Sequence, residues 1–191
     1  MPDLTEYLKN KKYSQNGEDG ILEEIFKRLK IDKGYFVDVG AWDGKYLSNT
    51  YLFVEKGWEG LEIEGNPKYI SKMHKLLPFN IKIYSHYIEP DKLDYILGYY
   101  DAPRRFDLLS IDIDTYDYWI WKNLTIYRPK VVIIESNSME GLYIQPPQFD
   151  FKGKKGASPL ALRDLGRRKG YTEVFFNGNL IFVDNKYYGN L

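Results

Sequence analysis

The sequence predicts an α/β protein with a mostly parallel sheet and helices on both faces. Short runs rich in β-branched and aromatic residues alternate five times with helix-like segments between residues 34 and 170, the pattern of strands joined by crossover helices. Two further β-rich runs then flank Asn177-Gly178, a dipeptide typical of tight hairpin turns. Together these observations predict a seven-stranded sheet whose last two strands form a C-terminal antiparallel hairpin.

Each predicted element has its own local signal. The first helix carries its apolar residues on one face, and Gly57 ends the second. Asn66-Pro67 and Ser158-Pro159 are N-cap and first-turn pairs that begin two later helices. The expected strands lie at residues 34–40, 60–64, 81–88, 106–113 and 130–136, with the hairpin at 171–185. The expected helices lie at residues 21–29, 50–56, 67–76, 91–97, 116–124 and 158–170.

Length and composition favour a single domain. The chain has 191 residues, a formal net charge of zero and no cysteine, so it has no overall basic field for nucleic acid and no disulfide or thiolate metal site. No apolar run approaches the roughly 20 residues of a membrane span. We therefore expect a cytoplasmic protein without a membrane span or a nucleic-acid partner. Residues 1–33 are expected to form an N-terminal helical segment and residues 34–191 the core.

Polar residues follow the ends of several predicted strands. Open α/β sheets bind ligands outside the carboxyl ends of their parallel strands. This rule brings polar positions that are far apart in the sequence to one rim of the sheet. The positions expected there are residues 40–44, 64, 86–87, 112–114 and 135–137.

The loop after the first strand, GAWDG, indicates a cofactor site. It matches neither the G-x-G-x-x-G dinucleotide fingerprint nor the P-loop. Gly40 permits a tight turn and close approach of a ligand, and Asp38 is placed to fix the backbone of the loop. Glu64 lies 24 residues after Gly40, at the end of the second strand. An acid at this place can accept hydrogen bonds from both ribose hydroxyls.

Four segments together resemble FkbM-type class I S-adenosylmethionine-dependent methyltransferases: YSQNGEDG, FVDVGAWDGKYLSNT, GWEGLEIEGNP and LLSIDIDTYDYWIW. The resemblance implies a Rossmann-like fold and S-adenosyl-L-methionine as the cofactor. It also implies a set of cofactor contacts. Gly40, Ala41 and Trp42 would line the methionine part, Glu64 would hold the ribose, Tyr87 and Ile88 would flank the adenine, and Ser14 and Gln15 would close over the amino-acid end.

Asp112, Glu135 and Asn137 follow two strands that are expected to be neighbours. Their oxygen atoms suit a hard cation such as Mg²⁺, Mn²⁺ or Ca²⁺. The arrangement resembles metal-dependent O-methyltransferases that act on catechols and sugars. An alternative interpretation is that Asp112 and Asp114 contact the cofactor or cap the following helix.

The metal hypothesis implies simple chemistry. The ion would bind two oxygens of the acceptor and lower the pKa of the attacking hydroxyl. Asp114 or Asp117 would take the proton, and His86 is a further candidate base because it lies at the same rim. The predicted reaction is therefore O-methylation, with metal assistance as one form of it.

The acceptor is expected to meet the loop at residues 139–157, since long loops in compact domains often cover active sites. Tyr143, Pro146, Pro147 and Phe149 offer apolar surfaces, while Lys152, Lys154 and Lys155 offer positive charge or form a solvated loop. These residues favour a small-molecule or glycan acceptor, such as a sugar carrying a phosphate or a nucleotide.

Two other functions remain compatible with the sequence. One is a non-catalytic module that keeps the fold and binds only a cofactor or a partner. The other is oxidative chemistry at the same metal site, which is disfavoured because the chain has two histidines on different elements and lacks a 2-His-1-carboxylate set.

Overall fold

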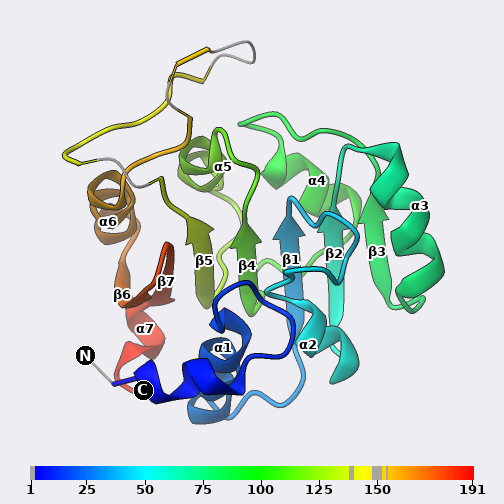
Figure 1. The fold of residues 1–191 in the computed structure, drawn as a ribbon, viewed down its shortest axis with the longest axis horizontal. Coiled ribbons are helices and arrows are strands. Elements are labelled where there is room, and N and C mark those ends of the chain that lie inside the picture. The colour runs from blue at the N-terminus through cyan, green and yellow to red at the C-terminus, as the bar shows by residue number, and fades with distance from the viewer. Residues whose placement is uncertain (1–2, 138–139, 148–151, 154) are drawn as a thin grey trace.

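The computed structural model describes residues 3–137, 140–147, 152–153 and 155–191. Within these residues, one seven-stranded sheet has the order β3-β2-β1-β4-β5-β7-β6 (Figure 1). The predicted fold class is confirmed, because the first five strands run parallel and β7 is antiparallel to both β5 and β6. The strands are β1 (Tyr35–Val39), β2 (Glu59–Ile63), β3 (Ile81–Tyr84), β4 (Leu108–Ile111), β5 (Val131–Glu135), β6 (Tyr171–Phe176) and β7 (Asn179–Asp184).

The helices include the six whose bounds the sequence predicts and two further short ones. The additional elements are η1, which falls within the N-terminal segment that is expected to be helical, and α7, whose four residues span about one turn. None of the helices in the described part of the chain is long and apolar enough to cross a lipid bilayer. The helices are η1 (Thr5–Asn10), α1 (Glu18–Arg28), α2 (Tyr51–Glu55), α3 (Pro67–Leu76), α4 (Leu93–Tyr99), α5 (Asp117–Asn123), α6 (Pro159–Arg168) and α7 (Asn185–Tyr188).

The strand order reverses at β1, which lies between β2 and β4. The arrows of β1, β2, β4 and β5 point toward the top of Figure 1, so their carboxyl ends meet at one edge. Two strands end at least two residues earlier than predicted: β3 ends at Tyr84 and β4 ends at Ile111. His86, Tyr87 and Asp112 therefore lie in loops above the sheet, in the crevice where open α/β sheets bind ligands.

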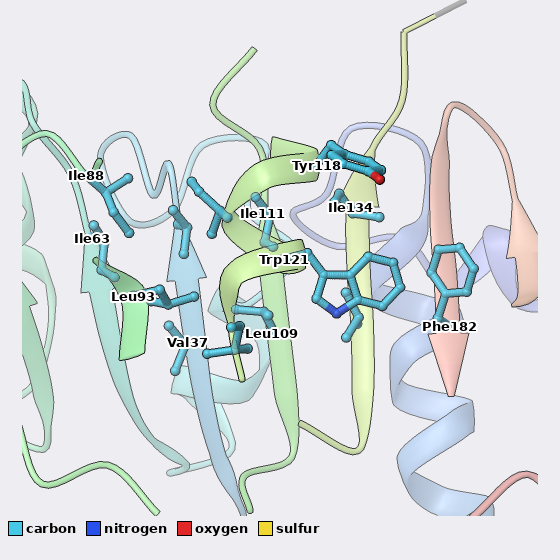
Figure 2. Close-up of a cluster of buried hydrophobic side chains, with 14 of the residues drawn as sticks. Val37, Ile63, Ile88, Leu93, Leu109, Ile111, Tyr118, Trp121, Ile134 and Phe182 are labelled. Atoms are coloured by element: carbon cyan, nitrogen blue, oxygen red, sulfur yellow. The ribbon is translucent and has the colours of Figure 1, made fainter. Parts of the chain in front are cut away.

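The hydrophobic core has one layer on each face of the sheet. Val37, Leu109 and Ile134 face α4, α5 and α6, and Figure 2 shows this layer with Trp121 of α5 beside Phe182 of β7. The ring centroids of Trp121 and Phe182 are 5.0 Å apart. The opposite layer packs α1 and α2 against the sheet. The first layer reaches the carboxyl edge, where Ile63, Ile88 and Tyr116 belong both to this core and to the lining of a cavity above the sheet.

Two acids interrupt the layer that faces α1 and α2. Asp38 on β1 and Glu62 on β2 are register partners, and both are buried. Asp38 accepts a hydrogen bond from the Thr50 hydroxyl at 2.8 Å, which ties β1 to the start of α2. Neither carboxylate oxygen of Glu62 has a hydrogen-bond partner among the described residues. Burial, followed by repulsion from Asp38, raises the pKa of Glu62 well above its ordinary value.

Replacing Glu62 with methionine should therefore flatten the pH dependence of stability. The folded-state pKa of Glu62 lies above the unfolded value of about 4.3, so the native state holds a proton that the unfolded chain releases. Wild-type stability should fall as the pH rises above that value, by up to about 1.4 kcal/mol per pH unit for this group. Urea unfolding at pH 5 and pH 8 measures the effect. Glu59→Met, at the exposed start of the same strand, is the control, and equal pH dependence in wild type and Glu62→Met would contradict the assignment.

Candidate active site

Gly40 brings the loop after β1 against the end of β4. Its φ of +93° is in the left-handed region, and an added Cβ would lie 1.8 Å from the carbonyl oxygen of Asp112. No side chain fits that space, so the close approach of two backbone segments requires glycine. The glycine of the predicted cofactor loop is thus needed for the shape of the crevice itself.

Glu64 follows β2 and holds the same loop from the other side. One carboxylate oxygen accepts a hydrogen bond from the Trp42 backbone N–H at 3.0 Å, and the other accepts one from the Asn66 N–H at 2.7 Å. These two hydrogen bonds fix the orientation of the Glu64 carboxylate at the edge of the crevice. Each oxygen retains a lone pair for a further donor, such as a ribose hydroxyl.

A cavity of about 510 Å³ opens between the loops after β1, β2, β3 and β4. Trp42 stands over it, with its ring centroid 5.3 Å from that of Tyr69. Most of the predicted cofactor contacts line this space, which is large enough for a nucleoside. The sequence-predicted residues that line it are Gly40, Trp42, Glu64, His86, Tyr87, Ile88, Asp112 and Asp114.

A second cavity, of about 200 Å³, adjoins the first and shares Gly40, Trp42, Asp112 and Asp114 with it. It extends toward the end of β5, and we call it the acid cavity. The other sequence-predicted residues in its lining are Gln15, Asp38, Ala41 and Glu135. Side chains predicted to contact the cofactor and side chains predicted to hold a metal thus meet at one wall.

Three carboxylates converge in the acid cavity. Asp112, Asp114 and Glu135 each offer an oxygen, and these oxygens all lie within 4.8 Å of one another. Burial is the main cause that raises the pKa of Asp112 to about 6, and repulsion from Asp114 adds to it. Burial, with repulsion from Asp112 and Asp114, likewise raises the pKa of Glu135 to about 8. Three acids held this close at an energetic cost form a site suited to a cation.

Asp114, which the sequence predicts as a base, joins Asp112 and Glu135 in this cluster, while Asn137 is not in the lining of the acid cavity. A φ of +61° at Asp114 turns its exposed side chain toward the other two acids. The side-chain amide of Asn137 instead donates a hydrogen bond to the Lys155 carbonyl, and its backbone N–H donates to Ala157. The Asn137 side chain therefore holds the loop that follows β5.

The other two candidate bases have different surroundings. Asp117 is buried and accepts hydrogen bonds from the backbone N–H groups of Ile113 at 2.8 Å and Thr115 at 3.1 Å. It shapes the loop that carries Asp112 and Asp114, and burial is the main cause that raises its pKa to about 7. His86 lines the larger cavity and lies outside the lining of the acid cavity.

The segment before α1 closes one side of the acid cavity. Gln15 is in its lining, while Ser14 is buried and donates a hydrogen bond from its hydroxyl to Asp19 at 2.6 Å. Sequence reasoning missed Asn179, which also lines this cavity and donates to Glu18 at 3.0 Å. Asn179 begins β7, immediately after the predicted hairpin turn. Only the antiparallel pairing of β7 with β5, which sets Asn179 opposite Glu135, places it at the site.

Part of the predicted acceptor loop is anchored beside this region. The Trp119 indole N–H donates to the Gln145 carbonyl at 2.6 Å, and the side chain of Gln145 accepts from the Gly156 N–H. Lys152 and Lys155 line neither of the two cavities. Met139, Phe149 and Lys154 lie outside the described residues.

The seven-stranded sheet, mostly parallel with a C-terminal antiparallel hairpin, is a Rossmann-like fold that is shared with solved S-adenosylmethionine-dependent methyltransferases. No protein-family model matches the chain, and no curated protein matches it in sequence. The class of fold is therefore established by comparison with solved structures.

Three of these structures illustrate the likeness. A protein from Pyrococcus horikoshii assigned as an RNA methyltransferase aligns over 96% of this chain and 91% of its own, with 12% identity and a TM-score of 0.55. A TehB-like SAM-dependent methyltransferase from Corynebacterium glutamicum aligns over 85% and 86%, with 13% identity and a TM-score of 0.52. A protein from Staphylococcus aureus assigned to the caffeoyl-CoA O-methyltransferases aligns over 94% and 88%, with 14% identity and a TM-score of 0.56.

Proposed function

We propose that this protein is an FkbM-type S-adenosylmethionine-dependent O-methyltransferase. Its acceptor is a hydroxyl of a sugar, a glycan or a related small molecule, and a divalent cation assists the reaction. The observation that carries this proposal is the convergence of Asp112, Asp114 and Glu135 beside the cavity that Gly40 and Glu64 shape.

The larger cavity suits the cofactor. Glu64 would accept hydrogen bonds from the ribose, Trp42 and Gly40 would flank the methionine part, and Tyr87 and Ile88 would lie beside the adenine. Gln15 approaches from the segment before α1, across the acid cavity. S-adenosylmethionine, when bound, supplies an electrophilic methyl group. The methionine part, beside Gly40 and Asp112, would then lie between the nucleoside and the acceptor.

The acid cavity fits a hard divalent cation, because its three converging ligands are all carboxylates. Bound there, Mg²⁺, Mn²⁺ or Ca²⁺ would offset the repulsion among the acids and polarise the acceptor hydroxyl. Asp112 and Glu135 would hold the ion. Asp114 lies at the exposed rim and would either complete the ligand set or take the hydroxyl proton.

A direct assay tests the proposal. The protein is incubated with S-adenosylmethionine, Mg²⁺ and a panel of monosaccharides, sugar phosphates and nucleotide sugars, and release of S-adenosylhomocysteine is followed. We expect turnover with members of the panel, loss of turnover with EDTA, and recovery on adding Mg²⁺ or Mn²⁺. Turnover that persists in excess EDTA would remove the cation from the proposal and leave the acids as cofactor contacts.

Glu64→Ala should weaken S-adenosylmethionine binding by about 1–3 kcal/mol, the range for a lost charge-assisted hydrogen bond. Glu64→Gln keeps one acceptor oxygen and should fall between this variant and wild type. Calorimetric titration measures both, with Glu59→Ala at the far end of β2 as the control. An unchanged affinity in Glu64→Ala would exclude Glu64 from the ribose site.

A further inference from the structure

We propose that a third cavity, beside the acid cavity, binds a phosphate or diphosphate group carried by the acceptor. This assignment rests on the proposed function for the identity of the acceptor. The cavity has a volume of about 460 Å³ and lies between the segment before α1, the loop after β1 and helix α3. We call it the lysine cavity, because Lys11, Lys12, Lys45 and Lys72 line it.

The charge of the lysine cavity differs from that of the whole chain. The protein has zero formal net charge, whereas this lining contains four lysines and one acid, Asp43. The carboxylate of Asp43 already has hydrogen-bond partners within the protein. It accepts hydrogen bonds from the backbone N–H groups of Lys45 at 3.2 Å and Tyr46 at 2.8 Å, and from the Lys72 ammonium at 3.4 Å. The acid therefore shapes the wall, and the remaining charge is strongly positive.

The ammonium groups retain donors for a ligand. Lys11 donates to the Gln15 carbonyl at 2.6 Å, and Lys45 lies over the rings of Tyr51 at 4.7 Å and Tyr13 at 5.4 Å. These contacts hold two of the side chains in place. Because each ammonium has three N–H donors, one hydrogen bond or one ring contact leaves others to point at an anion. The lining contains no arginine, and lysine binds phosphate as a point charge.

The lysine cavity adjoins the acid cavity, and the two share part of one wall. Tyr46 and Leu47 line both spaces. Ser14 lines the lysine cavity, is bridged to Leu47 and is followed in the chain by Gln15 of the acid cavity. An acceptor that places a hydroxyl near Asp112 could therefore extend its anionic group past Tyr46. The geometry selects a phosphorylated sugar or a sugar nucleotide over a neutral sugar.

The test is calorimetric titration with inorganic pyrophosphate in metal-free buffer. Wild-type protein should bind it, and the affinity should fall with added salt, because exposed charges are screened. The Lys12→Gln/Lys45→Gln double variant should lose at least tenfold in affinity. Lys75→Gln, on the exposed surface of α3 and outside the cavity lining, should lose less than twofold.

Titration with S-adenosylmethionine separates the anion site in the lysine cavity from the proposed methyltransferase function. The double variant should keep wild-type affinity for S-adenosylmethionine, which also shows that it is folded. Absence of pyrophosphate binding, or equal loss in Lys75→Gln, would overturn the lysine cavity while leaving the methyltransferase proposal intact. Pyrophosphate binding without any S-adenosylmethionine binding would instead overturn the proposed function.

Discussion

Replacing Gly40 with alanine should abolish S-adenosylmethionine binding and destabilise the fold. The added methyl group would lie 1.8 Å from the Asp112 carbonyl oxygen, a backbone atom that cannot rotate away. Either the segment after β4 or the loop after β1 must move, and both line the two cavities. We expect a loss of about 2–5 kcal/mol of unfolding free energy, from overpacking of about 1–3 kcal/mol and left-handed strain of about 1–2 kcal/mol at the alanine. Urea unfolding and calorimetric titration measure the two effects.

Gly57→Ala is the matched control for backbone strain. Gly57 has a φ of +75°, and the nearest atom to its added Cβ is the flexible Lys33 ammonium at 3.7 Å. The Gly57→Ala variant should therefore lose only about 1–2 kcal/mol of unfolding free energy, the cost of backbone strain, and it should bind S-adenosylmethionine with wild-type affinity. If Gly40→Ala is no less stable than Gly57→Ala and binds equally well, the crevice is not built on the close approach at Gly40.

Glu135→Gln and Asp112→Asn should each lose at least tenfold in Mn²⁺ affinity while making the metal-free protein more stable. The folded-state pKa values of Asp112 and Glu135 are raised, to about 6 and about 8. Stability therefore falls as the pH rises from the unfolded-state values near 4 through this range. Neutral replacements escape that cost, so their gain in stability should be larger at pH 8 than at pH 5. Mn²⁺ at 100 times its Kd should stabilise wild type by about 2.7 kcal/mol.

Thermal unfolding at both pH values, with and without Mn²⁺, separates a cation site from a set of helix-capping acids. Glu89→Gln, an exposed acid in the loop after β3, is the control and should behave as wild type. A metal ligand should combine lost Mn²⁺ affinity with gained stability, whereas a structural cap should lose stability on neutralisation. Lower stability together with unchanged Mn²⁺ affinity would assign the acids to the loop structure.

The seven-stranded sheet was predictable because its signals are local. The alternating apolar runs, the Asn66-Pro67 and Ser158-Pro159 starts and the Asn177-Gly178 turn each mark one element. The order of the strands in the sheet is a tertiary feature that these local signals leave open. The short elements η1 and α7 lack a helical repeat of apolar residues that would mark their bounds in the sequence. The sequence also does not predict that the buried carboxylate of Glu62 lacks a hydrogen-bond partner among the described residues, since a strand pattern does not show which atoms a side chain contacts.

The site was predictable in its location and less so in its contacts. Parallel strands present their carboxyl ends at one edge of the sheet, and this rule predicts that four residues meet there. The structure shows them lining the two adjoining cavities: Gly40, Glu64, Asp112 and Glu135. The place of Asp114 depends on a left-handed backbone in a loop, and sequence spacing carries no sign of it. Asn179 reaches the site because β7 pairs with β5, which lies more than forty residues earlier in the chain. Such long-range pairing leaves no local signal in the sequence.

Calorimetric titration of the wild-type protein with S-adenosylmethionine, S-adenosylhomocysteine and NAD tests the central claim most directly. Gly40 and Trp42 of the GAWDG loop and Glu64 line the larger cavity, which we propose as the nucleoside site. We expect S-adenosylmethionine and S-adenosylhomocysteine to bind at one site per chain, to compete with each other, and to lose affinity in Glu64→Ala. NAD should not bind measurably. Binding of NAD with equal or higher affinity, or absence of binding by both S-adenosyl compounds at millimolar concentration, would contradict the account.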